Sequence, residues 1–190
     1  TLEGNALTVN AKVAGELRVR VLDASGLPLR GFARQDCEPL RGDLIDRLVR
    51  WKGNLGSLEG MAVRLATQKA PPETWQEWVD KLREGGPMEK LLEKGDVEGY
   101  FNAYDGLRRR IIEAAENPVL AGMLDSILEK TRVIMRRVQI LPGRAATGLA
   151  EHRAFVSAMR AGDAERAEQL RRANIRSAIQ TLKRFQNFIL

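Results

Sequence analysis

This chain of 190 residues contains one histidine, His152, and one cysteine, Cys37. A dedicated zinc or iron site needs three or four nitrogen or sulfur ligands, so these residue types alone cannot build one. A disulfide within the chain is excluded as well, and nothing argues for an oxidising compartment. A histidine-dependent catalytic triad could use only His152. We therefore expect no catalytic residues, no metal and no cofactor.

Long apolar runs and clustered charge are also missing. No stretch reaches the roughly 18 apolar residues of a membrane span, although 44% of the residues are apolar and can fill a core. The formal net charge is +6, from 31 basic and 25 acidic residues. Because the charges are interspersed, they favour anionic partners only weakly. We interpret the arginine runs at 108–110, 136–137 and 171–172 as solvated helix faces, and we expect a cytoplasmic protein that does not bind membranes.

The N-terminal part of the chain shows the alternation of a β-strand. Leu17, Val19 and Val21 recur with a period of two, which is typical of a half-buried strand. The sequence DASG that follows favours a turn. Together they predict a hairpin from Glu16 to about Ala33, within a β-rich and incomplete segment that covers residues 1–54.

From Pro71 onward the apolar spacing becomes helical. One helix is predicted to begin near Pro72, and Asn117 and Asp163 are predicted N-caps. Further helices are predicted over about 97–116, 117–140, 149–161 and 164–188, with LPGRAATG (141–148) as a loop. The expected fold class is mainly α, an antiparallel helical bundle over residues 55–190 preceded by a small β-hairpin or partial sheet.

Three stretches of the helical part carry a family resemblance. They are LEGMAVRLATQKA (58–70), IIEAAENPVL (111–120) and AEHRAFVSAMRAGDAERAEQLRRANI (150–175). In this order and at these separations they resemble the FCD domain, the effector-binding domain of FadR-like regulators in the GntR family. The resemblance covers about residues 55–190. It implies a dimeric, non-enzymatic domain that senses a ligand and passes the signal to a DNA-binding domain.

DNA binding by such a regulator requires a winged helix-turn-helix domain. No pair of helices of that kind is predicted before residue 40. We expect contact with DNA only through a domain that this sequence does not contain.

The pocket of that family often holds a divalent metal bound by one aspartate and three histidines. Carried over by position, the aspartate falls at Tyr104, next to Asp105, and the histidines fall at Arg108, His152 and Asn174. Only His152 keeps the type of residue that the family uses. The resemblance therefore implies that the effector, a small carboxylate or related anion, is bound without a metal. The predicted ligand-binding residues are Tyr104, Arg108, His152 and Asn174, arranged around one cavity.

Two roles remain open for Arg108. A buried guanidinium needs an anionic partner, which the carboxylate or phosphate of a ligand could supply. Alternatively, Arg108 extends to the surface or pairs with a nearby aspartate or glutamate. Catalysis by Glu151 with His152 is not expected, because consecutive helix residues do not face each other.

A second resemblance covers residues 4–66. The stretches GELRVRVLDASGLPLRGF, DCEPLRGD and WKG resemble a β-sandwich module of glycoside-hydrolase-related bacterial proteins. The two resemblances overlap at 55–66, a segment that fits either a strand or a helix. Two alternative functions follow: a carbohydrate-associated sandwich with a helical tail, or a composite chain without an evolved activity.

Overall fold

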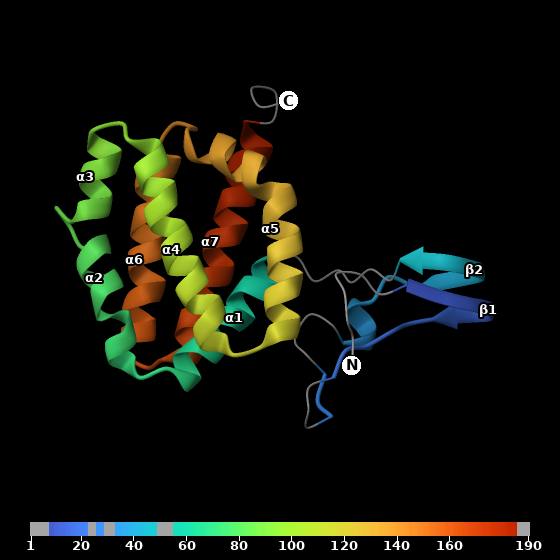
Figure 1. Ribbon diagram of the computed structural model, residues 1–190. Coiled ribbons are helices and arrows are strands. Elements are labelled where there is room, and N and C mark those ends of the chain that lie inside the picture. Colours follow the sequence, from blue (N-terminus) through green and yellow to red (C-terminus); the bar gives the residue numbers. More distant parts are fainter. Residues whose placement is uncertain (1–7, 23–25, 29–32, 49–54, 186–190) are drawn as a thin grey trace.

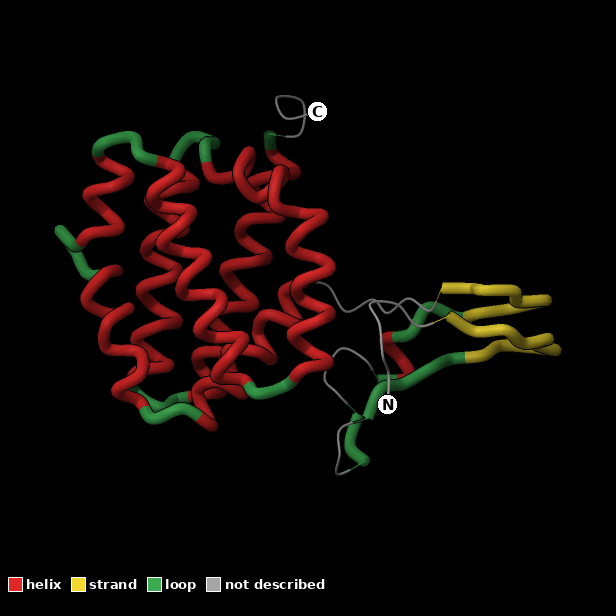
Figure 2. The backbone as a smooth tube through the Cα atoms, in the orientation of Figure 1, coloured by secondary structure: helices red, strands yellow, loops and turns green. Residues whose placement is uncertain are grey.

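The computed structural model describes residues 8–22, 26–28, 33–48 and 55–185. Most of these residues lie in a helical bundle (Figures 1 and 2). A two-stranded antiparallel sheet of β1 (Thr8–Leu17) and β2 (Leu40–Leu48) lies to one side of the bundle, with the 3-10 helix η1 (Arg34–Asp36) between the strands in sequence. The expected fold class, mainly α with a small sheet before the bundle, is confirmed.

The bundle buries one continuous apolar core. Helix α1 packs most extensively against α7 and α4, and α6 packs against α7. Segment 55–66, which fitted either a strand or a helix, is helical. The elements of the bundle are α1 (Leu55–Lys69), the 3-10 helix η2 (Pro72–Trp75), α2 (Gln76–Leu82), α3 (Pro87–Glu93), α4 (Val97–Ala115), α5 (Pro118–Gln139), α6 (Arg144–Arg160) and α7 (Ala164–Arg184).

Local capping signals set the starts of several helices. The side chain of Asn117 accepts a hydrogen bond from the backbone N–H of Leu120, at 3.0 Å, and begins α5. Asp163 accepts one from the N–H of Arg166, at 2.9 Å, and begins α7. Both predicted N-caps are thus confirmed, because a short polar side chain satisfies an N–H that the first helical turn leaves unpaired.

Three helix boundaries differ from the prediction. The helix expected near Pro72 is divided into η2 and α2, which places Trp75 in the core. Residues 141–148 are not all loop, because α6 begins at Arg144, directly after Gly143 at a φ of +73°. Ala145 and Ala146 have high helix propensity and extend α6 toward the N-terminus. Helix α7 ends at Arg184 with Phe185 as its C-cap, and residues 186–188 of the predicted helix lie outside the described residues.

Within the described residues, the predicted hairpin from Glu16 to about Ala33 is reduced to an isolated antiparallel bridge between Leu22 and Pro28. Strand β1 ends at Leu17 and pairs with β2, so that Leu17 lies opposite Leu40. The alternating side chains of Leu17, Val19 and Val21 pack into two different cores. Leu17 and Val19 pack on the small cluster of Cys37, Leu40 and Leu44, whereas Val21 packs against the core of the bundle. Residues 23–25 and 29–32 of the predicted hairpin lie outside the described residues.

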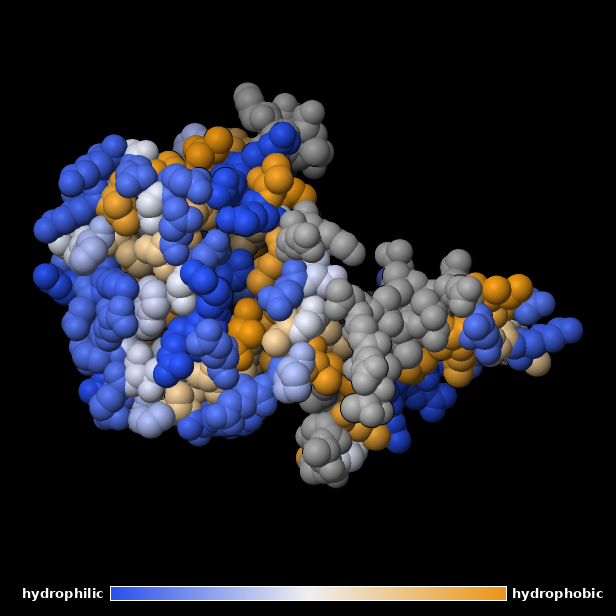
Figure 3. All heavy atoms as spheres, viewed as in Figure 1, coloured by the Kyte–Doolittle hydropathy of each residue, from blue (hydrophilic) through white to orange (hydrophobic). Residues whose placement is uncertain are grey.

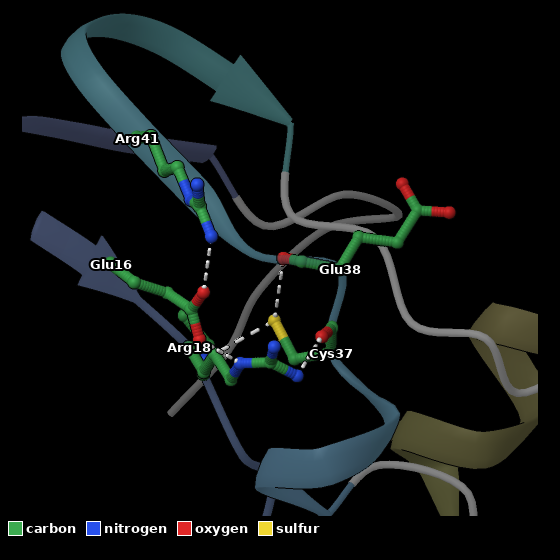
Figure 4. Close-up of polar contacts among 6 residues, drawn as sticks. Glu16, Arg18, Cys37, Glu38 and Arg41 are labelled. Carbon is green, nitrogen blue, oxygen red and sulfur yellow. Dashed lines mark hydrogen bonds and ion pairs between the residues drawn. The ribbon is translucent and has the colours of Figure 1, made fainter.

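Polar contacts fasten this small sheet to the loop before β2 (Figure 4). Glu16 binds the guanidinium of Arg18 and, at 2.9 Å, that of Arg41. Hydrogen bonds from Arg18 and Arg41 lower the pKa of Glu16 to about 2. The backbone N–H of Val19 donates to Sγ of Cys37 at 3.2 Å. Cys37 itself is fully buried, as a small apolar side chain would be.

The exterior of the helical body is mostly hydrophilic in the view of Figure 3. Within the described ranges, no helix is long and apolar enough to cross a membrane.

Candidate functional site

A stack of aromatic rings surrounds His152 inside the bundle. Its imidazole lies parallel to the ring of Tyr104 from α4, with ring centroids 4.2 Å apart and an interplanar angle of 11°. The ring of Phe155 meets it edge-on at 5.8 Å. The hydroxyl of Tyr100 and Nδ1 of His152 share a hydrogen bond of 3.0 Å. His152 is 6% exposed, so the ring is held from several sides away from water.

Glu59 of α1 joins two arginines beside this stack. Its Oε1 accepts a hydrogen bond of 3.0 Å from Nη2 of Arg108 on α4. Its Oε2 accepts from Nη2 of Arg171 on α7. The guanidinium of Arg171 also lies 5.7 Å from the ring centroid of Tyr104 and 5.4 Å from that of Phe155. One buried carboxylate therefore neutralises part of the positive charge of two largely buried guanidinium groups.

The polar network continues from Arg171 toward α6. Nη1 of Arg171 donates to Oδ1 of Asn174 at 2.5 Å, and Nδ2 of Asn174 donates to Oε2 of Glu151 at 2.6 Å. The same oxygen of Glu151 accepts from Arg144 at 2.9 Å. Arg144 also donates to Oγ of Ser177 at 3.1 Å. Three arginines and two glutamates from four helices thus form one connected network.

The environment keeps the aromatic stack neutral at physiological pH. Burial, together with the positive charges of Arg144 and Arg108, lowers the pKa of His152 to about 3. Burial also raises the pKa of Tyr100 and Tyr104 well above the ordinary value of a phenol. Desolvation penalises the charged form in all three cases. His152 consequently acts as a neutral hydrogen-bonding ring.

All four sequence-predicted residues belong to this cluster. Tyr104 stacks on His152, Asn174 bonds Arg171, and Arg108 reaches the same Glu59 as Arg171. Of the two roles left open for Arg108, pairing with an acidic side chain is observed: Glu59 holds it, and Asp105 approaches it at 3.9 Å. Leu149, Phe155 and Val156 are buried, as expected for the inward face of the helix that carries His152.

The expected shared cavity differs from the arrangement observed. Aromatic rings fill the space beside His152. A cavity of about 10 Å³, large enough for roughly one water molecule, lies instead beside Glu59, Arg108 and Arg171. A larger groove of about 580 Å³ lies on the other side of Arg108. Neither of these two spaces is lined by His152 or Asn174.

Sequence reasoning missed most of the charged partners in the cluster. Arg171, interpreted as part of a solvated face, is 2% exposed, and Arg108 is largely buried too. That interpretation is therefore wrong for both residues. The hydrogen bond between Arg171 and Glu59 joins positions 112 residues apart, which no local pattern can indicate. The recurrence of Arg171, Asn174 and Ile175 at helical spacing was the available signal for an inward face.

The residues at the four metal-ligand positions do not fit a divalent metal. The phenol of Tyr104 stays protonated, Arg108 carries a positive charge, and the amide of Asn174 is already bonded on both sides. Nδ1 of His152 is engaged by Tyr100. Within the part of the chain that the structure describes, no three His, Cys, Asp or Glu side chains gather as a metal site would require.

Comparisons with known proteins separate the two parts of the chain. No curated protein and no solved structure matches it. No family match supports the resemblance of residues 4–66 to a glycoside-hydrolase-related sandwich, and the described strands of this region form a two-stranded sheet. The FCD domain model matches residues 55–177, which is more than half of the chain and includes α1 to α6 and the buried cluster. The chain therefore belongs to the FCD domain family, whose members are the non-enzymatic effector-binding domains of GntR-family transcription regulators.

Proposed function

We propose that this domain senses a small carboxylate or related anion that it binds directly, without a metal. The observation that carries the proposal is the sharing of Glu59 by Arg108 and Arg171. Two guanidinium groups that share one carboxylate retain N–H donors for a second anion, and guanidinium groups bind carboxylates in a bidentate manner.

Each of the other predicted residues has a distinct part in this proposal. Tyr104 and Phe155 present ring faces to Arg171 and hold its guanidinium in place. The neutral His152 fixes the rings of Tyr104 and Tyr100. Asn174 links Arg171 to Glu151 and so connects the anion position to α6.

Signal transmission is proposed through α1, because Glu59 lies on the helix that follows the N-terminal segment. A ligand that competes for Arg108 would change the contact of α1 with α4 and α7. We propose that a DNA-binding domain elsewhere in the regulator responds to this change, and that the protein acts in the cytoplasm as a homodimer. The exposed Val133, Ile134 and Ile140 near the C-terminal end of α5 are apolar surface that supports an association of copies. We also propose residues 1–54 as an N-terminal segment distinct from the helical domain of residues 55–190.

Calorimetric titration with a panel of small organic acids tests the proposal. We expect Arg108→Ala to cost an anionic ligand about 2–5 kcal/mol of binding free energy, the penalty for removing one side of a desolvated charge pair. His152→Ala should cost less, about 0.5–1.5 kcal/mol, because a neutral imidazole contributes one hydrogen bond. Arg110→Ala is the matched control, since Arg110 lies on the same helix and its side chain is 48% exposed. Binding that is equally strong in Arg108→Ala and Arg110→Ala would refute the proposal.

A further inference from the structure

The groove of about 580 Å³ lies between α4 and α5, on the outer side of Arg108. Ligand pockets commonly have volumes of about 300–1,000 Å³. Helix α5 makes few contacts with α4, so the space between them is not filled by side chains from the two helices. Its lining residues are Asn102, Asp105, Arg108, Arg109, Ile112, Asp125, Leu128 and Arg132. Arg108 lines both this groove and the small inner cavity beside Glu59.

The charges in the groove are incompletely paired. Arg108 and Arg132 approach the two carboxylate oxygens of Asp105 at 3.9 and 3.8 Å. These distances exceed those of a hydrogen bond, so N–H groups of both arginines remain available for a shorter contact. Arg109 forms no ion pair with any residue that the structure describes. Three arginines and two aspartates line the groove, and Glu59 holds Arg108 from the inner side.

Two aliphatic side chains complete the lining. Ile112 of α4 and Leu128 of α5 border both the groove and the inner cavity. A ligand with a short hydrocarbon segment could contact them while its charged ends meet arginines. The groove thus combines an apolar surface with arginines from both helices: Arg108 and Arg109 of α4 and Arg132 of α5.

We propose that the groove between α4 and α5 binds a small dicarboxylate and so completes the anion site that Arg108 begins. One carboxylate contacts Arg108 and Arg132, and the second contacts Arg109. The methylene groups between them lie against Ile112 and Leu128. This inference rests on the proposed function, and it adds the ligand's second charged group and the residues that select it.

Affinities of succinate, glutarate and the monocarboxylate butyrate, measured by titration calorimetry at low ionic strength, test the proposal. We expect a dicarboxylate to bind at least about tenfold more tightly than butyrate, because it makes one additional charge-assisted contact. Arg109→Ala should remove about tenfold of the dicarboxylate affinity and leave that of butyrate unchanged. Arg110→Ala, the neighbouring arginine outside the groove, should change neither.

A second variant gives an effect of the opposite sign. Asp105→Asn removes the carboxylate that competes for Arg108 and Arg132, so it should tighten dicarboxylate binding by about threefold or more. A loss of folding cannot imitate a gain in affinity. Thermal unfolding curves of each variant check that the fold is retained.

The outcomes separate the two proposals. If the anions bind but Arg109→Ala and Arg110→Ala behave alike, or butyrate binds as tightly as the dicarboxylates, the groove is not the subsite and the proposed function stands. If dicarboxylates bind and Asp105→Asn weakens them, the groove is again excluded. If neither the mono- nor the dicarboxylates bind, the proposed sensing of small carboxylates fails, and the groove proposal fails with it.

Discussion

The molecule contains the same arrangement of charges twice, in two different surroundings. In the N-terminal sheet, Glu16 binds Arg18 and Arg41, whose side chains are 27% and 69% exposed (Figure 4). In the bundle, Glu59 binds Arg108 and Arg171, whose side chains are 15% and 2% exposed. One carboxylate and two guanidinium groups therefore meet once near water and once in the core.

The difference in burial gives the two clusters different consequences. Near the surface, water and salt screen the charges, and such pairs contribute little to stability. In the core, each charge depends on its protein partners, because the cost of desolvation is large and is offset only by the contacts. The buried cluster costs free energy to desolvate and keeps N–H donors available, as a binding site for an anion would. The exposed cluster has no such cost to offset.

The largest expected effect comes from removing the carboxylate of each cluster. We predict that Glu59→Ala lowers the free energy of unfolding by about 3–5 kcal/mol, because it leaves two buried guanidinium groups without their partner. Glu16→Ala should leave it nearly unchanged, since water replaces the lost contacts. Urea unfolding of both variants measures the contrast. Equal losses in the two variants would show that burial does not distinguish the two clusters.

The pH dependence of stability follows from His152. Its pKa is about 3 in the folded state and lies near 6.5 in an unfolded chain. Between these values the unfolded state binds the proton that the folded state excludes, so stability should fall as the pH falls from about 6.5. The slope approaches about 1.4 kcal/mol per pH unit for a single group.

Replacing His152 isolates this contribution. His152→Gln cannot take up the proton, so its unfolding free energy should depend less steeply on pH between 4.5 and 6.5 than that of the wild type. Urea titrations at several pH values provide the measurement. Parallel pH profiles for the two proteins would show that His152 is not held neutral by its surroundings.

The smallest expected effect concerns salt. The screening length of water falls from about 10 Å at 0.1 M salt to about 3 Å at 1 M. We predict that the pKa of Glu16, lowered to about 2 by its arginines, rises toward its usual value as salt is added. The stability difference between wild type and Glu59→Ala should change little, because the buried contacts are shielded from ions. Carboxyl NMR titration and urea unfolding at the two salt concentrations measure these responses.

Sequence patterns predicted the parts of this fold that depend on neighbouring residues. Asn117 and Asp163 could be identified as caps because each acts on an N–H three residues away. The pairing of β1 with β2 could not, since Leu17 and Leu40 are joined by a long connection and the alternation near Val19 and Val21 serves two cores. Local rules hold where the partner is close in the chain.

The same distinction applies to the candidate site. The family resemblance located His152, Arg108, Tyr104 and Asn174, and the structure brings these side chains into one network. It gave no indication of Glu59 or Arg144 as their partners, because those contacts connect different helices. In the sequence, a basic pair such as Arg171 and Arg172 is typical of an exposed helix face. Only the packing of the helices shows that Arg171 is buried.

We propose that guanidinium groups, rather than a metal, hold the anion. Calorimetric titration of chelator-treated protein with the organic acid that binds most tightly tests it most directly, with metal analysis of the same sample. We predict the same affinity before and after chelation, and no stoichiometric zinc, nickel or manganese. Binding that disappears with chelation and returns when one of these metals is added would show that a metal holds the anion.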